Sequence, residues 1–193
     1  MRRFWRVIAL LVMSSVFLSG CLNGLWSGAT LLYDRHNVYK KISDYQLFLT
    51  ASHALREDNL YMRKDASVEI AVFNGDLLLV GYVPSLELRN EAQKRVGALS
   101  GCRRLFNQLS IRSTAENPLQ DSWITGEIRS QIFMDSAIDP SKFKVITADQ
   151  IVYLMGDVDP AQANLVISIA RQCAGVKRVV KLFKYLHLTD SST

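Results

Sequence analysis

Two stretches of this chain repeat the same alternation of hydrophobic and polar positions. Val68, Ile70 and Val72 alternate with polar or small residues, which is the period of a half-buried β-strand. A turn-forming run and a second apolar segment follow at residues 74–83, and they align with residues 149–158 at an offset of 75. The pattern therefore predicts one β-hairpin in each half of the chain.

Helical periodicity flanks each hairpin. Residues 84–100 and 159–174 follow the hairpins, begin with Pro or Asp-Pro, and stop at a glycine, as helices commonly do. Residues 44–58 and 121–135 precede the hairpins and are amphipathic. Their apolar stripes correspond at an offset of 77, with Leu47, Ala51 and Leu55 in the first copy and Ile124, Ile128 and Ile132 in the second. A last strand is predicted at residues 102–111 and again at 176–185.

Each half thus has the order α-β-β-α-β. Three strands with two helices on one face make a two-layer sandwich, so we predict an α+β fold with two tandem domains. The expected boundaries are a leader at 1–20, a tether at 21–43, a first domain at 44–112, a linker at 113–120, a second domain at 121–187 and a tail at 188–193.

The leader is typical of an export signal. Arg2, Arg3 and Arg6 are its positive end, and the apolar core at residues 7–18 is too short to span a bilayer with ordinary flanks. The run Leu-Ser-Gly-Cys that ends at Cys21 resembles the lipobox of bacterial lipoprotein precursors. This resemblance implies cleavage before Cys21 and acylation of the cysteine.

By the same resemblance, Leu22 after the cysteine favours anchoring at the periplasmic face of the outer membrane, since aspartate there marks retention at the inner one. Two alternatives stay open. In the first, the leader is an ordinary secretory signal and the cysteine after it is incidental. In the second, the leader is an anchor helix that is not cleaved.

Several runs of the repeat resemble the BON domain of bacterial envelope proteins. They are the glycine that closes the second strand, the Trp123-Ile124 pair, and the Gly-Val-x-x-Val run at residues 175–179. Two such domains behind a lipobox resemble the dual-BON outer-membrane lipoproteins, which implies a non-enzymatic role in outer-membrane integrity, including at division sites. One departure is Lys181, where the third strand of the family usually carries asparagine, as Asn107 does in the first domain.

Charge and cysteine content narrow the classes of partner. The formal net charge is +5, but three arginines lie in the leader, and residues 21–193 carry only +2. Because basic and acidic residues are interleaved, we expect no nucleic-acid surface. Cys102 and Cys173 occupy apolar positions of different domains in the repeat, so we expect each to pack in its own core and no disulfide between them.

No constellation of residues predicts catalysis, a metal or a cofactor. His36, His53 and His187 are not spaced with other ligands as a metal site requires. The chain also has no glycine-rich phosphate loop, nucleophile elbow or paired-carboxylate motif. We therefore expect a protein that is not an enzyme.

The helix at residues 121–135 has a second apolar face. Trp123 replaces Gln46 of the first repeat, and at about 100° per residue it points away from the core stripe. A tryptophan at one end and Phe and Met at the other suit the headgroup boundary of a bilayer. The family resemblance implies that this helix binds anionic phospholipid of the phosphatidylglycerol kind. The candidate lipid contacts are Trp123, Gly126, Arg129, Ser130, Phe133 and Met134.

Other uses of this surface remain open. The second face can instead pack on the first domain or on its own sheet, and the domains can instead dock an envelope protein partner or peptidoglycan. A group of basic residues on the last strand can meet anionic headgroups together with Arg129, or lie on a solvated strand face; its members are Lys177, Arg178, Lys181 and Lys184.

Overall fold

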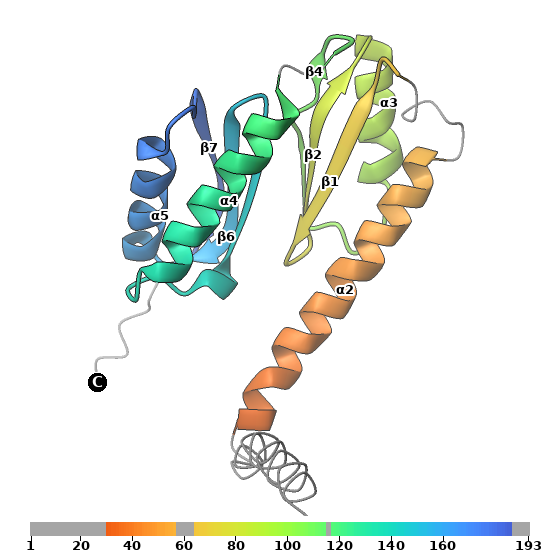
Figure 1. Ribbon diagram of the computed structural model, residues 1–193. Helices are drawn as coiled ribbons and strands as arrows, with labels where there is room; N and C mark the ends of the chain where they lie inside the picture. The colour runs from red at the N-terminus through yellow and green to blue at the C-terminus, as the bar shows by residue number, and fades with distance from the viewer. Residues whose placement is uncertain (1–29, 57–63, 115–116, 187–193) are drawn as a thin grey trace, which may run out of the picture. The chain divides into compact units, whose positions relative to one another are not determined.

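The structure is a computed structural model that describes residues 30–56, 64–114 and 117–186, with the backbone alone at 30–38. The first repeat contains α2 (Thr30–Arg56), β1 (Ser67–Phe73), β2 (Asp76–Val83), α3 (Leu86–Gly97), β3 (Arg104–Asn107) and β4 (Ser110–Ile111). The second contains α4 (Pro118–Met134), the 3-10 turn η2 (Pro140–Lys142), β5 (Phe143–Ala148), β6 (Ile151–Val158), α5 (Pro160–Gln172) and β7 (Arg178–Tyr185), as Figure 1 shows.

Each repeat forms one sheet with its second strand in the middle. The order is β1-β2-β3 in the first sheet, where β4 continues along β2, and β5-β6-β7 in the second. The hairpin strands are antiparallel and the last strand is parallel to the middle one. A right-handed crossover through a helix is the usual way to make such a parallel pair. The α+β fold class with tandem α-β-β-α-β domains is therefore confirmed, and we call the repeats domain 1 and domain 2.

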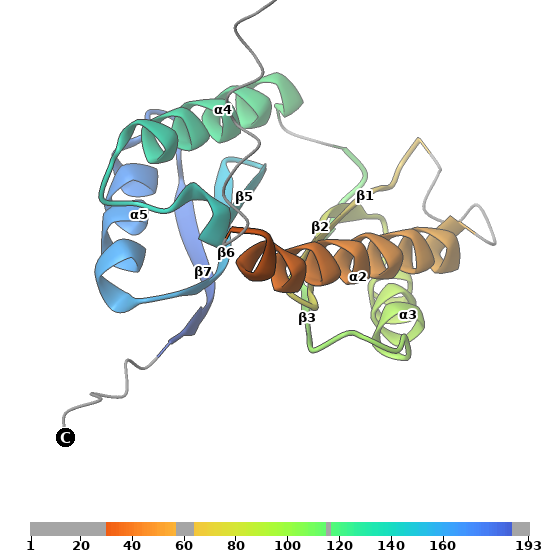
Figure 2. The same cartoon turned by 90° about the horizontal axis from the view of Figure 1, so that it is seen from below.

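Two helices cover one face of each sheet. Leu47, Ala51 and Leu55 of α2 pack with Ala92 and Val96 of α3 in the core of domain 1, and Figure 2 shows both helices on one side of β1 and β2. The isoleucine stripe of α4 packs with α5 in the core of domain 2. These cores bury the apolar stripes that the sequence pattern predicts.

The starts of α2 and α4 differ most from the sequence prediction. α2 begins at Thr30 and not at residue 44, because residues 30–43 contain no proline or glycine that would interrupt a helix. α4 begins at Pro118, inside the stretch predicted as a linker. The Asn117 side chain caps it by accepting from the Gln120 amide, and proline is well suited to the first helical position.

Both hairpins turn through left-handed backbone. Asn74 and Gly75 have φ of 48° and 79°, and Asp149 and Gln150 have 57° and 62°, as a type I′ turn requires. An aspartate of the preceding helix supports each turn. The Asp44 carboxylate accepts from the amides of residues 74 and 75 at 2.7 and 2.8 Å. Asp121 accepts from the amides of residues 149 and 150, both at 2.7 Å.

A third hydrophobic cluster joins the two sheets. It is built from the sheet faces that carry no helices, with Ala71, Leu78 and Val80 in domain 1 and Ile146, Tyr153, Met155 and Leu182 in domain 2. The domains are therefore packed sheet to sheet. The sequence analysis did not predict this contact, since it treated each sheet as a surface with one buried face.

The two cysteines of the domains lie in separate clusters, as predicted from the repeat. Cys173 is buried in the core of domain 2, and Cys102 packs against the core of domain 1. Burial raises the pKa of both thiols, so neither has the character of a reactive thiolate.

Candidate functional site

Helix α4 buries one face and exposes another. Ile124 and Ile128 are fully buried. On the far side, the exposed fraction is 84% for Leu119, 53% for Trp123, 79% for Phe133 and 71% for Met134, with the exposed Gly126 and Ser130 between them. We call these six residues the outer face of α4. Sequence reasoning missed Leu119 because it placed residues 113–120 in a linker.

The outer face is not used by the packing of the domains. Trp123 belongs to none of the three hydrophobic clusters formed by the described residues. Packing on domain 1, the alternative use of this surface, therefore does not account for the ring. Isolated exposed apolar residues are ordinary, but several on one helix face are typical of an interaction surface.

Arg129 lies off the outer face, on the flank of α4. Its Nη2 donates to the Val145 carbonyl at 2.7 Å, which holds the side chain over the edge of β5. Arg129 thus lies beside the apolar members of the predicted lipid site, one helical turn before Phe133. The structure places the guanidinium at a cleft between the domains.

This interdomain cleft has a volume of about 560 Å3. Domain 1 contributes Ser67, Glu69, Gly81 and Tyr82, and domain 2 contributes residues 145–149 of β5 and its turn, together with Asp121, Ser122, Thr125, Gly126 and Arg129 of α4. Such a volume falls within the range of about 300–1,000 Å3 that small-ligand sites occupy. Sequence reasoning did not single out the residues of domain 1, because only the packing of the two sheets brings β1 next to α4.

The surrounding protein shifts the pKa of Glu69, which lines the cleft, and of Lys144, which lies next to the cleft-lining residues of β5. Desolvation raises the pKa of the Glu69 carboxyl, and the charges of Arg129 and Lys144 oppose that rise while Asp121 adds to it. Desolvation lowers the pKa of Lys144, whose Nζ donates to the Val72 carbonyl at 3.0 Å. Perturbed groups in a cleft mark candidate sites.

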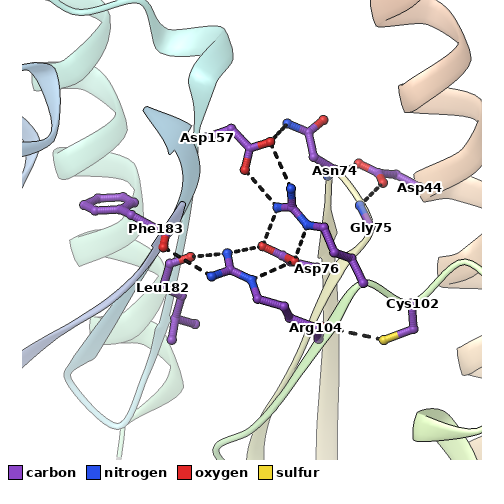
Figure 3. A network of polar contacts seen from close by, with 10 residues as sticks. Asp44, Asn74, Gly75, Asp76, Cys102, Arg104, Asp157, Leu182 and Phe183 are labelled. Carbon is purple, nitrogen blue, oxygen red and sulfur yellow. Dashed lines mark hydrogen bonds and ion pairs between the residues drawn. The ribbon is translucent and has the colours of Figure 1, made fainter. Parts of the chain in front are cut away.

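A charged network lies elsewhere on the domain contact, around the first hairpin (Figure 3). The buried Asp76 carboxylate pairs with Arg103 at 2.7 Å and with Arg104. Arg103 continues to Asp157 of domain 2 at 2.8 Å, while Arg104 donates to the Leu182 carbonyl of domain 2 at 3.3 Å. Burial alone would raise the pKa of Asp76, but the hydrogen bonds of the two arginines outweigh it and lower that pKa. The network ties the domains together.

The basic residues of the last strand do not form one patch. Lys177, Arg178, Lys181 and Lys184 are all exposed. Along β7, however, Leu182 packs between the sheets and Phe183 packs toward the helices. Because side chains alternate along a strand, Lys181 and Lys184 lie on different faces.

The remaining predictions concern the lipidation site, the three histidines, metal ligands and membrane-spanning helices. Cys21, His36 and His187 lie outside the described side chains, and His53 is exposed on α2. Among the described residues, no three histidine, cysteine, aspartate or glutamate side chains gather as metal ligands. Within the same residues, no helix combines the length and apolarity needed to cross a bilayer.

Comparison with known proteins matches the BON domain family model to residues 53–113 and 120–186. The outer membrane lipoprotein DolP of Haemophilus influenzae is 29% identical over 185 residues, covering 93% of this chain and 95% of that protein. A 21 kDa hemolysin of Actinobacillus pleuropneumoniae is 26% identical, covering 79% of each chain. The osmotically-inducible protein Y of Escherichia coli is 29% identical over 60% of each.

Proposed function

This chain belongs to the BON-domain family, and from that membership we propose a lipid-anchored envelope protein that binds anionic phospholipid through the outer face of α4. Acylated Cys21 holds it at the periplasmic face of the outer membrane, and the domains act without catalysis to support membrane integrity. The similarity to a protein named an outer membrane lipoprotein supports the location. The lipobox-like run that ends at Cys21 supports the anchor.

The observation that carries the lipid contact is the exposure of four large apolar side chains on one face of α4. Leu119 and Trp123 lie in its first half, and Phe133 and Met134 end its last turn, about 20 Å away at 1.5 Å per residue. A helix that lies in the plane of a bilayer buries such a face about 5–10 Å deep, with tryptophan near the headgroups.

The anchor and the helix have different roles in this proposal. The acylated Cys21 attaches the protein to the membrane, and α4 supplies a second, separate contact with the lipid surface. The anchor also raises the effective concentration of the helix at the surface, which allows the protein–lipid contact itself to be weak. Where the protein dwells along the membrane then depends on the lipid that α4 meets.

The test uses the chain from residue 21 with Cys21→Ser, so that no acyl group contributes. We expect it to cosediment with vesicles that contain phosphatidylglycerol and not with vesicles of phosphatidylcholine alone. Trp123→Ala and Phe133→Ala together should weaken that binding at least about tenfold, since each removes a large apolar group from the membrane contact. The matched control is Leu165→Ala, which removes an exposed apolar side chain from α5 in the same domain and should leave binding unchanged.

Binding that ignores the anionic lipid, or that survives loss of both aromatic rings, would contradict the proposal. Photocrosslinking from position 123 in cells addresses the adaptor alternative. Crosslinks to phospholipid are expected, whereas one dominant protein partner would assign the outer face to that partner.

A further inference from the structure

Strand β1 lies at the edge of the sheet of domain 1, and part of this edge is open (Figure 1). The residues of an edge strand alternate between those that bond to the neighbouring strand and those whose backbone groups face outward. The Val72 carbonyl accepts from Lys144 Nζ at 3.0 Å, so Val72 faces outward. By alternation, Ile70 and Val68 face outward as well. No described group forms a hydrogen bond with the outward amide or carbonyl of either residue.

Domain 2 covers the same edge of its own sheet. Val145 of β5 corresponds to Ile70 at the offset of 75, and its carbonyl accepts from Arg129 of α4 at 2.7 Å. At the offset of 77 between the two helices, Ser52 of α2 takes the position of Arg129. A serine side chain has neither the length nor the five N–H donors of an arginine. Domain 1 therefore leaves open the edge that domain 2 closes.

A groove of about 450 Å3 lies between α2 and the open edge. Its apolar lining residues are Phe48, Leu55, Val68 and Ile70. Tyr45 and Leu49 precede Ser52 by seven and three residues, so they lie on the same side of α2, where their exposed fractions are 62% and 48%. Exposed apolar side chains beside an unpaired strand edge are typical of a surface that docks another chain.

The interdomain cleft lies on the other face of the open edge and has an excess of acidic groups. Glu69 is exposed between the two outward residues and lines this cleft. Asp121, Asp149 and Arg129 are the other charged residues of the lining, and Asp149 is paired with Arg112. This leaves two acids against one base. Because paired residues of adjacent strands point to the same face, a residue opposite Glu69 would enter the cleft, where a basic side chain is favoured.

We propose that the open edge of β1 binds an extended segment of another protein, in which a basic residue lies between two apolar residues. The segment adds a strand to the sheet and exchanges backbone hydrogen bonds with Val68 and Ile70. Its apolar side chains enter the groove beside α2, and its basic side chain lies next to Glu69. This site is separate from the outer face of α4.

A second copy of this chain fits the edge poorly. In a two-fold antiparallel pair that uses the outward groups of both Val68 and Ile70, the two Glu69 side chains lie directly opposite each other. Like charges in that position are destabilising, and a charged residue on an edge strand is a common means of preventing such pairing. Glu69 therefore favours a different chain with a basic residue.

The test uses the chain from residue 21 with Cys21→Ser and a fluorescent peptide of sequence Ser-Val-Lys-Val-Lys-Val-Ser. Fluorescence anisotropy should show saturable binding. Methylation of the valine backbone nitrogens keeps the side chains but removes the donors, so it should weaken binding at least about tenfold. Glutamate in place of both lysines should also weaken binding, although the charge of +2 on residues 21–193 would by itself favour the acidic peptide.

Ser52→Arg gives domain 1 the residue with which domain 2 closes its edge. We expect the new guanidinium to donate to the Ile70 carbonyl and to weaken peptide binding at least about tenfold. Binding to phosphatidylglycerol vesicles, which the proposed function assigns to α4, should be retained. The matched control is Thr50→Arg, which adds the same charge at an exposed position on the opposite side of α2 and should leave peptide binding unchanged.

Four results would overturn the proposal. They are no binding of the peptide, equal binding of its methylated form, equal binding of its acidic form, and binding that Ser52→Arg leaves intact. None of them touches the proposed function, because vesicle binding is measured separately on the same chains. Sedimentation addresses the remaining occupant of the edge. A dimer that Ser52→Arg dissociates and Thr50→Arg does not would assign the edge to a second copy and contradict the proposal.

Discussion

The physical reason for a glycine differs among three positions of the repeat. At Gly81, φ is 111° and an added Cβ would lie 2.1 Å from the Ser67 carbonyl oxygen. At Gly156 the added atom would lie 2.5 Å from the Lys142 carbonyl oxygen. Each of these glycines lets the middle strand approach the strand before it in its own domain. Gly126 has no such neighbour, so the fold dictates glycine at the first two positions and not at the third.

The contrast predicts opposite effects on stability. Gly81→Ala should lower the free energy of unfolding by about 2–4 kcal/mol, because it combines left-handed strain with a clash against backbone. Gly126→Ala should raise it by up to about 1 kcal/mol, since alanine is the better helix residue and the space is open. Urea denaturation of both variants measures the difference. A loss of stability in Gly126→Ala would show that the helix needs glycine for its own packing.

At the scale of elements, the third strand distinguishes the domains. Domain 1 breaks it into β3 and β4, and domain 2 keeps β7 continuous. The Asn107 side chain accepts from the Leu109 amide at 3.3 Å and donates to the Arg89 carbonyl of α3 at 2.9 Å. The corresponding Lys181 is exposed and pairs opposite Leu154 in an unbroken ladder. The single asparagine therefore accounts for the break and fastens α3 to the strand.

Exchanging these residues should have unequal effects. Asn107→Lys removes hydrogen bonds to partly buried backbone and should destabilise the protein by about 1–2 kcal/mol. Lys181→Asn changes an exposed position and should stay within about 0.5 kcal/mol. Thermal unfolding of the two variants in the same buffer checks this. Equal losses would mean that the asparagine has no special part in domain 1.

Periodicity predicted the order of the elements because each helix and hairpin buries one face within its own domain. Boundaries were less accurate where the signal was local, as at Asn117 and Pro118, which form a helix cap but lie in a stretch predicted as a linker. The sequence also contains a pattern that indicates the packing of the two sheets, although our prediction did not include it. Residues 77–80 of β2 and 152–155 of β6 are continuous apolar runs, and a strand without alternation is typically buried on both faces. Glu69 could not be recognised as a residue of the interdomain cleft before that packing was known.

At the scale of the molecule, the third cluster buries apolar side chains of each domain against the sheet of the other. Leu78 is fully buried, yet it belongs to the cluster between the sheets and not to the core beneath α2 and α3. Its neighbour Leu77 is also fully buried, and it belongs to the core of domain 1. Substitution of Leu77 therefore tests packing within domain 1, and substitution of Leu78 tests packing between the domains.

The two leucines therefore give the last prediction. The unsubstituted chain should unfold in one calorimetric transition, because the third cluster couples the domains. Leu78→Lys places a charge between the sheets and should split this transition into two, while Leu77→Lys should remove the folded domain 1 altogether. Leu78→Lys should also keep binding to phosphatidylglycerol vesicles, because no residue of α4 belongs to the third cluster. A single transition in Leu78→Lys would show that the sheet-to-sheet contact does not couple the domains.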